Sequence, residues 1–271
     1  MARSLVVLLA TLALVATSSG ASAGEASKSS TLSRIVSSGT LRVGMSGSQP
    51  PLNFKSKGAV MLGLEVDLAR ALAGLMGVKL EIVEKPFSKL LDAVAGGEVD
   101  LVMSGVTTTP KRSLRVAFVG PYFLSGKSIL TRSSSLAQAE EAGDLDQSDL
   151  KLAALEGSTS QQFVESFLPK ASLVTTPSYD EAVKLLLADE VNAVVADREI
   201  VTLTAFLYPK EGLATLREPL TLEPIGIAAP LGDAALVNYL ENAMGALEAS
   251  GLSSALRARW LERSDWVQEL P

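Results

Sequence analysis

The sequence contains no cysteine and no histidine in its 271 residues. Without cysteine, the chain has no thiol nucleophile, no disulfide and no thiolate metal site. Without histidine, it has no Ser-His-Asp triad, no imidazole base and no ordinary zinc site. Any catalysis would rest on carboxylates, Lys, Tyr, Ser or Thr alone. We therefore expect a protein that is not an enzyme and that uses neither a cofactor nor a metal.

Long apolar runs are also missing, except near the N-terminus. An apolar stretch covers residues 5–16 after a start that contains Arg3, and Ala21-Ser22-Ala23 follows it. The stretch is shorter than the ~20 residues of a membrane-spanning helix, so a signal peptide over residues 1–23, cleaved after Ala23, is favoured over a membrane anchor. No cysteine follows the stretch to carry a lipid. The sequence therefore predicts a free periplasmic protein.

Positive charge is scarce, because 24 Lys and Arg stand against 30 Asp and Glu, for a net charge of −6. Removing the predicted signal peptide takes away Arg3 and leaves −7. This acidity argues against nucleic-acid binding, which needs basic patches to neutralise phosphates. We expect a monomer that binds a small molecule.

The first half of the chain alternates between short apolar strands and amphipathic helices. Strands are predicted at Leu41–Met45, Lys79–Val83 and Val99–Met103, and helices at Glu65–Met76 and Ser88–Ala95. A β-α-β-α-β order at these lengths predicts a mostly parallel sheet covered by helices.

A second unit of the same kind follows from Lys127. Its predicted strands are Lys127–Leu130, Lys151–Leu155, Ser172–Thr175 and Asn192–Ala196, with helices at Thr159–Leu168, 179–187 and Arg198–Leu207. A further strand at Pro224–Ala228 and helices at Asp233–Ala249 and Leu252–Leu261 complete the chain. The fold class is therefore α/β with two units.

Ligands of open parallel sheets bind outside the carboxyl ends of the strands. The strand at 99–103 runs into a loop that contains Ser104, Gly105, Thr107 and Arg112. An arginine fork can hold a carboxylate through two parallel hydrogen bonds, although a lone loop arginine is more often solvated. This loop is a candidate site for an anionic group.

Three other strand ends carry further candidate ligand-binding residues. Ser158 and Thr159 open a helix and form either an anion site or ordinary N-caps, and Asp197 holds a ligand ammonium or caps its helix. Phe87 lines a pocket or belongs to the core. Taken together with Arg112, these residues match a zwitterion held between two units, with its carboxylate on Arg112 and its ammonium on Asp197.

An ordered series of motifs covers nearly the whole chain after residue 23. The motifs are Gly39–Gly44, Pro51 with Phe54, Gly63–Ala69, Val99–Gly105, Thr109–Arg112, Phe118–Tyr122, Gly157–Thr159 and Asp197. The series resembles the family 3 (polar-amino-acid type) periplasmic solute-binding proteins of ABC importers.

The resemblance implies a two-lobe periplasmic-binding-protein (Venus-flytrap) fold, in which each lobe is a mixed, mostly parallel sheet flanked by helices. Lobe 1 would combine residues 34–124 with 224–271, lobe 2 would cover 128–220, and the hinge crossovers would be 125–127 and 221–223. Residues 24–33 are expected to be a disordered lead-in.

The resemblance also implies roles for single residues. Arg112 would grip the α-carboxylate of an amino acid, and Asp197 would bind its α-ammonium. Further ligand contacts would come from Ser104, Gly105, Thr107, Ser158, Thr159 and Phe87. The expected partner is a membrane ABC permease, to which the ligand is delivered.

The sequence departs from the family pattern soon after the first strand. Basic- and glutamine-binding relatives usually carry an Asp there and an aromatic a few residues on, and here Ser46 and Gln49 stand at those ligand-binding positions. A cationic side chain would lose its partner, so we expect a small polar or neutral amino acid as ligand.

Two alternatives share this fold. Cyclohexadienyl (arogenate/prephenate) dehydratases use a glutamate general acid a few residues past the position of Asp197, where this chain has Ile200, with Glu199 one position away. Adjacent helical positions point about 100° apart, so Glu199 is an imperfect substitute. A sensor ectodomain is the other alternative.

Overall fold

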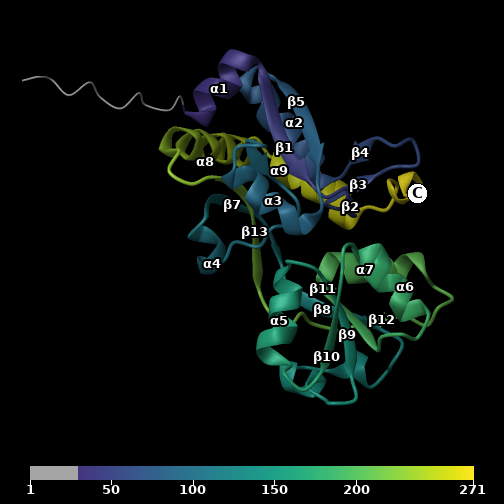
Figure 1. Ribbon diagram of the computed structural model, residues 1–271. Helices are drawn as coiled ribbons and strands as arrows, with labels where there is room; N and C mark the ends of the chain where they lie inside the picture. Colours follow the sequence, from purple (N-terminus) through teal and green to yellow (C-terminus); the bar gives the residue numbers. More distant parts are fainter. Residues whose placement is uncertain (1–29) are drawn as a thin grey trace, which may run out of the picture.

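The computed structural model describes residues 30–271, and the predicted signal peptide lies outside this range. The described chain forms two α/β lobes, one above the other in Figure 1, each with its own five-stranded sheet. We use lobe 1 for the part from α1 to β7 and from β13 to the last residue, and lobe 2 for the part from β8 to β12.

The sheet of lobe 1 has the strand order β5-β1-β6-β13-β7. Its strands are β1 (Thr40–Met45), β5 (Lys79–Glu84), β6 (Leu101–Val102), β7 (Val116–Ser125) and β13 (Glu223–Pro230). β1 pairs parallel with β5 and β6, whereas β13 runs antiparallel to β6 and β7. A strand from near the end of the chain thus completes a sheet begun at its start.

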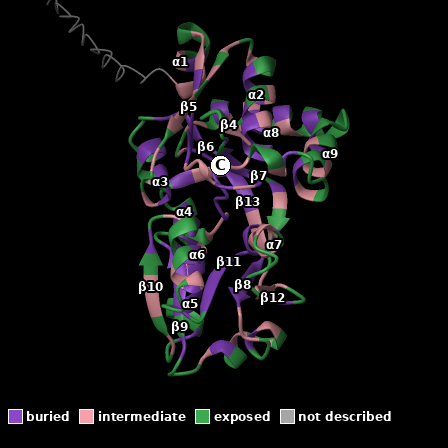
Figure 2. Ribbon diagram, turned by 90° about the vertical axis from the view of Figure 1, so that its right-hand side faces the viewer, coloured by how far each residue is buried: buried purple, intermediate pink, exposed green. Residues whose placement is uncertain are grey.

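Helices cover both faces of this sheet. α2 (Leu64–Met76) and α8 (Ala234–Ala249) pack on one face, against Val43 and Leu101, and α3 (Phe87–Ala95) packs on the other, against Val102. Neighbouring strand residues point to opposite faces, so Leu101 and Val102 serve different cores. Figure 2 shows the resulting buried strands and exposed outer helix faces.

Smaller elements surround this framework in lobe 1. They are α1 (Thr31–Ser38), the three-stranded sheet of β2 (Ser48–Gln49), β3 (Asn53–Lys55) and β4 (Met61–Leu62), α4 (Pro110–Ser113), α9 (Leu252–Arg257), the π-helical turn η3 (Ala258–Glu262) and η4 (Val267–Glu269). Phe54, Trp260 and Trp266 form an aromatic cluster that fastens the end of the chain to the small sheet.

Lobe 2 has the strand order β10-β9-β11-β8-β12. Its strands are β8 (Lys127–Thr131), β9 (Lys151–Leu155), β10 (Ser172–Thr176), β11 (Ala193–Asp197) and β12 (Ala214–Thr215), and its helices are α5 (Thr159–Phe167), α6 (Tyr179–Leu187), α7 (Arg198–Leu207) and the short turns η1 (Leu136–Gln138) and η2 (Ala142–Leu145). β9, β10 and β11 are parallel, and β8 runs antiparallel to β11 and β12. α5 covers one face of the sheet, and α6 and α7 cover the other.

The two segments that join the lobes touch each other at Gly126. A Cβ atom at this position would lie 2.2 Å from the carbonyl oxygen of Thr221 and 2.7 Å from Pro219. The amide of Lys127 donates to Oγ1 of Thr221 at 3.0 Å, and the amide of Leu220 donates to the carbonyl of Lys127 at 2.7 Å. Only a residue without a side chain fits between the segments at this point.

The predicted helices and strands of the two α/β units are present, and the differences lie in the strand β7 and in several short elements. A helix begins at Thr31, inside the segment expected to be disordered, because Ser30 caps it and Ile35 is buried. The long strand β7 and the small sheet were not predicted, since their residues lack a regular alternation. The last predicted helix ends at Arg257 and continues as η3, which carries Trp260 into the aromatic cluster. Within residues 30–271, no helix is long and apolar enough to cross a membrane.

We predict that Gly126→Ala lowers the free energy of unfolding by ~1–3 kcal/mol, because the added methyl group must push the joining segments apart. Urea unfolding of the variant and of the wild type measures this change. Gly74→Ala is the matched control: it lies on the exposed face of α2 with nothing within 4 Å of the new Cβ, and should stabilise by ~0.5–1 kcal/mol. Equal unfolding free energies for the two variants would contradict the packing argument.

Candidate functional site

Arg112 lies where the two lobes meet. Pro110 starts the short helix α4, and Thr109 caps it by accepting a hydrogen bond from the amide of Arg112 at 3.2 Å. The side chain is 7% exposed, and its Nη1 donates to the carbonyl of Thr107 at 2.8 Å. Its Nη2 donates to the carbonyl of Gly157, in lobe 2, at 3.1 Å. A guanidinium has five N–H donors, so three of them form no hydrogen bond with the described residues.

The surroundings of Arg112 are both dry and acidic. Burial lowers the pKa of Arg112 from its ordinary value of 12.5, and the charges of Asp197 and Glu223, followed by Tyr179, oppose that shift. These three residues come from lobe 2 and from the start of β13. The guanidinium therefore stands within electrostatic reach of the carboxylates on the other side of the junction.

A second contact joins the lobes beside Arg112. Oγ1 of Thr107 and Oγ1 of Thr159 are 3.1 Å apart, and Thr159 is the first residue of α5. Ser158 is the N-cap of this helix: its Oγ accepts from the amide of Gln161 at 3.1 Å and donates to the carbonyl of Leu155 at 2.6 Å. The hydroxyl of Ser158 is thus used for capping, and Thr159 is the one that faces lobe 1.

Asp197 has a partner that the sequence did not suggest. Its Oδ1 accepts a hydrogen bond from Nζ of Lys127 at 2.5 Å, and the same nitrogen is 3.5 Å from Oε2 of Glu223. Asp197 is 4% exposed and Lys127 is 1% exposed. Asp197 precedes α7, but its side chain makes no capping hydrogen bond. Asp197 is thus the N-cap of α7 by position, but its side chain binds Lys127 instead of capping the helix.

Ser46, Gln49 and Ser104 form one hydrogen-bonded group in lobe 1, in which Gln49 and Ser104 are buried and Ser46 is half-buried. Nε2 of Gln49 donates to Oγ of Ser46 at 2.8 Å, and to the carbonyl and Oγ of Ser104 at 3.0 Å each. Oγ of Ser104 also accepts from the amide of Ser46 at 3.0 Å. The structure thus brings these three predicted residues together, next to Gly105.

Glu65, in helix α2, fixes the position of the loop that contains Gly105. It is fully buried and accepts hydrogen bonds from the amide of Gly105 at 2.6 Å, from Nδ2 of Asn53 at 2.6 Å and from the hydroxyl of Tyr122. Burial raises the pKa of Glu65, and these hydrogen bonds oppose the shift. Gly105 has φ +60°, and a Cβ there would lie 2.8 Å from Oε1 of Gln49. The amide of Gly105, a predicted ligand-binding residue, is therefore already bound to Glu65.

Cavities lie between the lobes, and one of them is lined by Arg112. One of about 220 Å³ is lined by Phe87, Val106 and Arg112 of lobe 1 together with Gly157 of lobe 2. Another, of about 400 Å³, lies between Ser48 of lobe 1 and Tyr179 and Ile200 of lobe 2, with other residues of α6 and α7. Phe87 is 8% exposed and belongs to a core cluster, yet it also faces this junction.

Glu199 and Ile200 lie on different sides of the first turn of α7. Ile200 is buried and lines the 400 Å³ cavity. Glu199 lines a separate cavity of about 380 Å³ together with Pro51 and Phe123 of lobe 1, and its Oε2 accepts from Oγ of Ser125, at the end of β7, at 2.5 Å. Burial raises the pKa of Glu199 from 4.5 to about 7, the Ser125 hydrogen bond opposes this, and the charge of Asp197 adds to it. The carboxyl of Glu199 is thus turned to the strand that joins the lobes.

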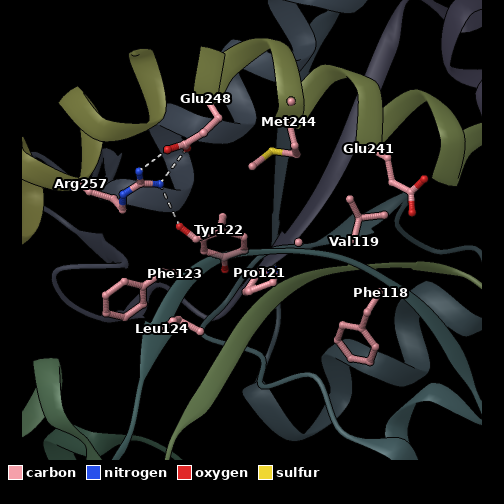
Figure 3. A pocket seen from close by; sticks show the side chains of 12 residues that line it. Phe118, Val119, Pro121, Tyr122, Phe123, Leu124, Glu241, Met244, Glu248 and Arg257 are labelled. Atoms are coloured by element: carbon pink, nitrogen blue, oxygen red, sulfur yellow. Dashed lines mark hydrogen bonds and ion pairs between the residues drawn. The ribbon is translucent and has the colours of Figure 1, made fainter. Parts of the chain in front are cut away.

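A hollow of about 640 Å³ lies elsewhere on lobe 1 (Figure 3). It is formed by β7 and α8, and Arg257 closes one end by donating to Glu248 at 2.8 Å and to the carbonyl of Tyr122 at 3.3 Å. It contains none of the predicted site residues and lies outside the lobe junction.

Three residues of the site were missed from sequence: Lys127, Glu223 and Glu65. A lysine that starts an apolar strand and a glutamate inside an apolar helix face were the available signals. Both are unusual, because charged residues are rarely fully buried without a partner. Their partners could not be named without the strand register.

Two α/β lobes, joined by two strands and holding charged groups at their junction, define the class of two-lobe binding proteins. Residues 41–263 match the bacterial extracellular solute-binding proteins, family 3. The chain belongs to this family, which confirms the resemblance found in the sequence.

Relatives support the fold and show two activities. Cyclohexadienyl dehydratase of Pseudomonas aeruginosa is 28% identical over 260 residues, which cover 96% of this chain and 95% of that protein. ABC transporter arginine-binding protein 1 of Escherichia coli is 26% identical over 225 residues, 81% of this chain and 90% of that protein. The crystal structure of an ancestral amino acid-binding protein, a precursor of cyclohexadienyl dehydratase, has a TM-score of 0.78 at 34% identity and covers 86% of this chain and 99% of that one. The predicted two-lobe periplasmic-binding-protein fold is thereby confirmed.

We predict that Glu199 makes the unfolding free energy pH-dependent in a way that Glu199→Gln removes. A carboxyl whose pKa is raised on folding stabilises the fold below its unfolded pKa, and this contribution is lost as the pH rises through about 7. The wild type should therefore lose stability relative to Glu199→Gln between pH 5 and pH 8, by at most ~3 kcal/mol. Urea unfolding at four pH values measures the difference, and Glu156→Gln, at an exposed position, is the control. If the unfolding free energies of wild type and Glu199→Gln changed with pH in parallel, the raised pKa of Glu199 would be contradicted.

Proposed function

We propose that the protein is an exported, periplasmic receptor that captures a small α-amino acid between its two lobes and delivers it to a membrane ABC permease. The observation that carries this proposal is the pair of opposite charges at the lobe junction. Arg112 keeps three N–H donors for a carboxylate, and Asp197 stands within electrostatic reach on the other side.

The charges at the junction match a zwitterion. Lys127 neutralises one of the two carboxylates that it contacts, so Asp197 and Glu223 together keep a surplus of one negative charge. Arg112 carries one positive charge. An α-carboxylate on Arg112 and an α-ammonium on Asp197 would meet the opposite charge at each end, in surroundings where charge-assisted hydrogen bonds are strong.

The joining segments supply the movement that such capture requires. We assign residues 125–127 and 221–223 as the hinge, with lobe 1 as 34–124 plus 224–271 and lobe 2 as 128–220. Thr107 and Arg112 contribute from lobe 1, and Thr159 and Asp197 from lobe 2. A ligand that contacts both sets stabilises the closed state, because only closure brings the sets together.

Selectivity would be decided around Ser46 and Gln49. Neither residue carries a charge, and the amide nitrogen of Gln49 is already bonded within lobe 1. A cationic ligand side chain would find no carboxylate at these positions, so a small polar or neutral amino acid is proposed. Relatives that bind arginine make arginine the informative competitor.

A dehydratase is the second candidate, favoured by the similarity to the Pseudomonas enzyme over 96% of the chain and by the pKa of about 7 at Glu199. A carboxyl with that pKa suits a general acid near neutral pH. Against this reading, the carboxyl of Glu199 is bonded to Ser125, and the apolar Ile200 is the one that lines the 400 Å³ cavity beside Tyr179, whereas Glu199 lines a separate cavity beside Pro51 and Phe123.

Isothermal titration tests both candidates. Residues 24–271 are unfolded and refolded to remove any bound ligand, then titrated with the twenty amino acids, arogenate and prephenate. Binding of one amino acid at micromolar affinity or better supports the receptor. If no amino acid binds, and arogenate or prephenate is turned over by the wild type but not by Glu199→Gln, the protein is a dehydratase instead.

For the amino acid identified, we predict that Arg112→Ala weakens binding by ~2–5 kcal/mol, since the ligand carboxylate would lose its buried partner. Arg112→Lys keeps the charge but loses the two parallel hydrogen bonds, so its affinity should lie between those of the wild type and Arg112→Ala. Arg70→Ala, an exposed arginine paired with Asp67 on α2, is the control and should bind as the wild type does. An unchanged dissociation constant in folded Arg112→Ala would refute the assignment.

A further inference from the structure

Lys127 is the one buried lysine in the part of the chain that the structure describes, with 1% of its surface exposed. A buried ammonium is costly unless it is paired and hydrogen-bonded. Its position is set by the first joining segment, because it follows Gly126 directly and opens β8. A fully buried charge at this place calls for a reason beyond packing.

The strand register brings Lys127 to Asp197. β8 runs antiparallel to β11, and Lys127 stands directly opposite Asp197 in the ladder. Residues opposite each other in an antiparallel pair have neighbouring side chains on the same face. Nζ of Lys127 donates a hydrogen bond to Oδ1 of Asp197 at 2.5 Å, and Oδ2 of Asp197 receives no hydrogen bond from residues 30–271.

The second joining segment is tied to the same lysine. Glu223 opens β13, and its Oε2 is 3.5 Å from Nζ of Lys127. Oγ1 of Thr221 accepts from the amide of Lys127 at 3.0 Å and donates to Oε1 of Glu223 at 3.0 Å. Lys127, which belongs to the first joining segment, thus contacts the second one through both its backbone amide and its side chain.

We propose that Lys127 is the positioning residue of the ammonium site: it fixes Oδ1 of Asp197, leaves Oδ2 for the α-ammonium of the ligand, and couples this carboxylate to the hinge through Glu223. The proposal rests on the proposed function and goes beyond it. Asp197 is ordered by an internal cation before any ligand arrives. The surplus negative charge of the Lys127–Asp197–Glu223 group is the counter-charge of the incoming amine.

Without the lysine, the two carboxylates would be like charges in a buried place. They lie within about 6 Å of one another, because both contact the same nitrogen, so without the ammonium between them their like charges would repel each other. Asp197 would also lose the partner that orients it. Both effects displace the acceptor of the ligand ammonium, and neither touches Arg112.

The test compares the bound amino acid with the same acid lacking its amine, by titration into the full mature chain. In the wild type, the amine should improve affinity ~10–100-fold, the value of one or two charge-assisted hydrogen bonds. In Lys127→Met this preference should fall below ~3-fold, while the affinity for the acid without the amine changes little. Lys170→Met, an exposed lysine near Asp146, is the control and should keep the full preference.

A double-mutant cycle with Asp197→Asn separates positioning from a general structural effect. If Lys127 acts through Asp197, the double variant should bind the amino acid within ~3-fold of Asp197→Asn alone. Equal losses for both ligands in Lys127→Met, or additive losses in the cycle, would show a merely structural role and overturn the proposal. Absence of amino-acid binding in the wild type would instead overturn the proposed function.

Glu223→Gln keeps the proposal testable if Lys127→Met does not fold. This variant retains the Lys127–Asp197 pair but removes the surplus negative charge. The preference for the amine should fall about 5-fold, with the affinity for the acid without the amine unchanged. An unchanged preference would contradict the charge count on which the proposal depends.

Discussion

The chain passes twice between its two sheets, and the remaining architecture depends on how closely these passages lie. Gly126 permits the contact with Thr221, and the hydrogen bonds of Lys127 hold it. Because the passages form the edge strand β7 and its neighbour β13, each continues directly into a sheet. The lobes are therefore joined at one narrow place, and the charged residues of the junction lie beside it.

The junction is held by a small number of buried polar groups, each with a partner. In lobe 1, Glu65 collects the amide of Gly105, Asn53 and Tyr122, and so fixes the loop that leads to Arg112. In lobe 2, Lys127 does the same for Asp197. Buried polar groups that are fully satisfied make a region rigid, whereas a single missing partner would be expensive. On each side of the junction, a buried charged residue thus holds the candidate ligand-binding groups in position.

Much of the fold could be predicted from sequence, because strands such as 41–45 and helices such as 65–76 carry clear apolar periodicity. Arg112 and Asp197 could be named as candidates because they follow strands whose ends must meet at one edge of a sheet. The pairing of Asp197 with Lys127 could not be predicted, since it depends on the register of β8 with β11, two strands more than sixty residues apart. The small sheet β2-β3-β4 was missed because two- and three-residue strands leave no periodic signal.

Helix phase decided another question that the sequence left open. Glu199 and Ile200 are neighbours, and which of them faces the cavity depends on the angle at which α7 leaves Asp197. The structure turns Ile200 to the 400 Å³ cavity beside Tyr179, and Glu199 to Ser125 and to a separate cavity beside Pro51. Sequence comparison shows only that Glu199 lies one position away from the expected glutamate. In the helix, one position is a rotation of about 100°, and this rotation separates the directions of the two side chains.

The discontinuous sheet of lobe 1 has a consequence for the order in which the protein can form during synthesis. All strands of lobe 2 lie between residues 127 and 215, so this lobe has its complete set once that stretch is available. Lobe 1 begins earlier but places β13 between β6 and β7, and its sheet keeps a gap until residues 223–230 arrive. The lobe that starts first is therefore the one that finishes last, and its long-range pairing is the slower step of assembly.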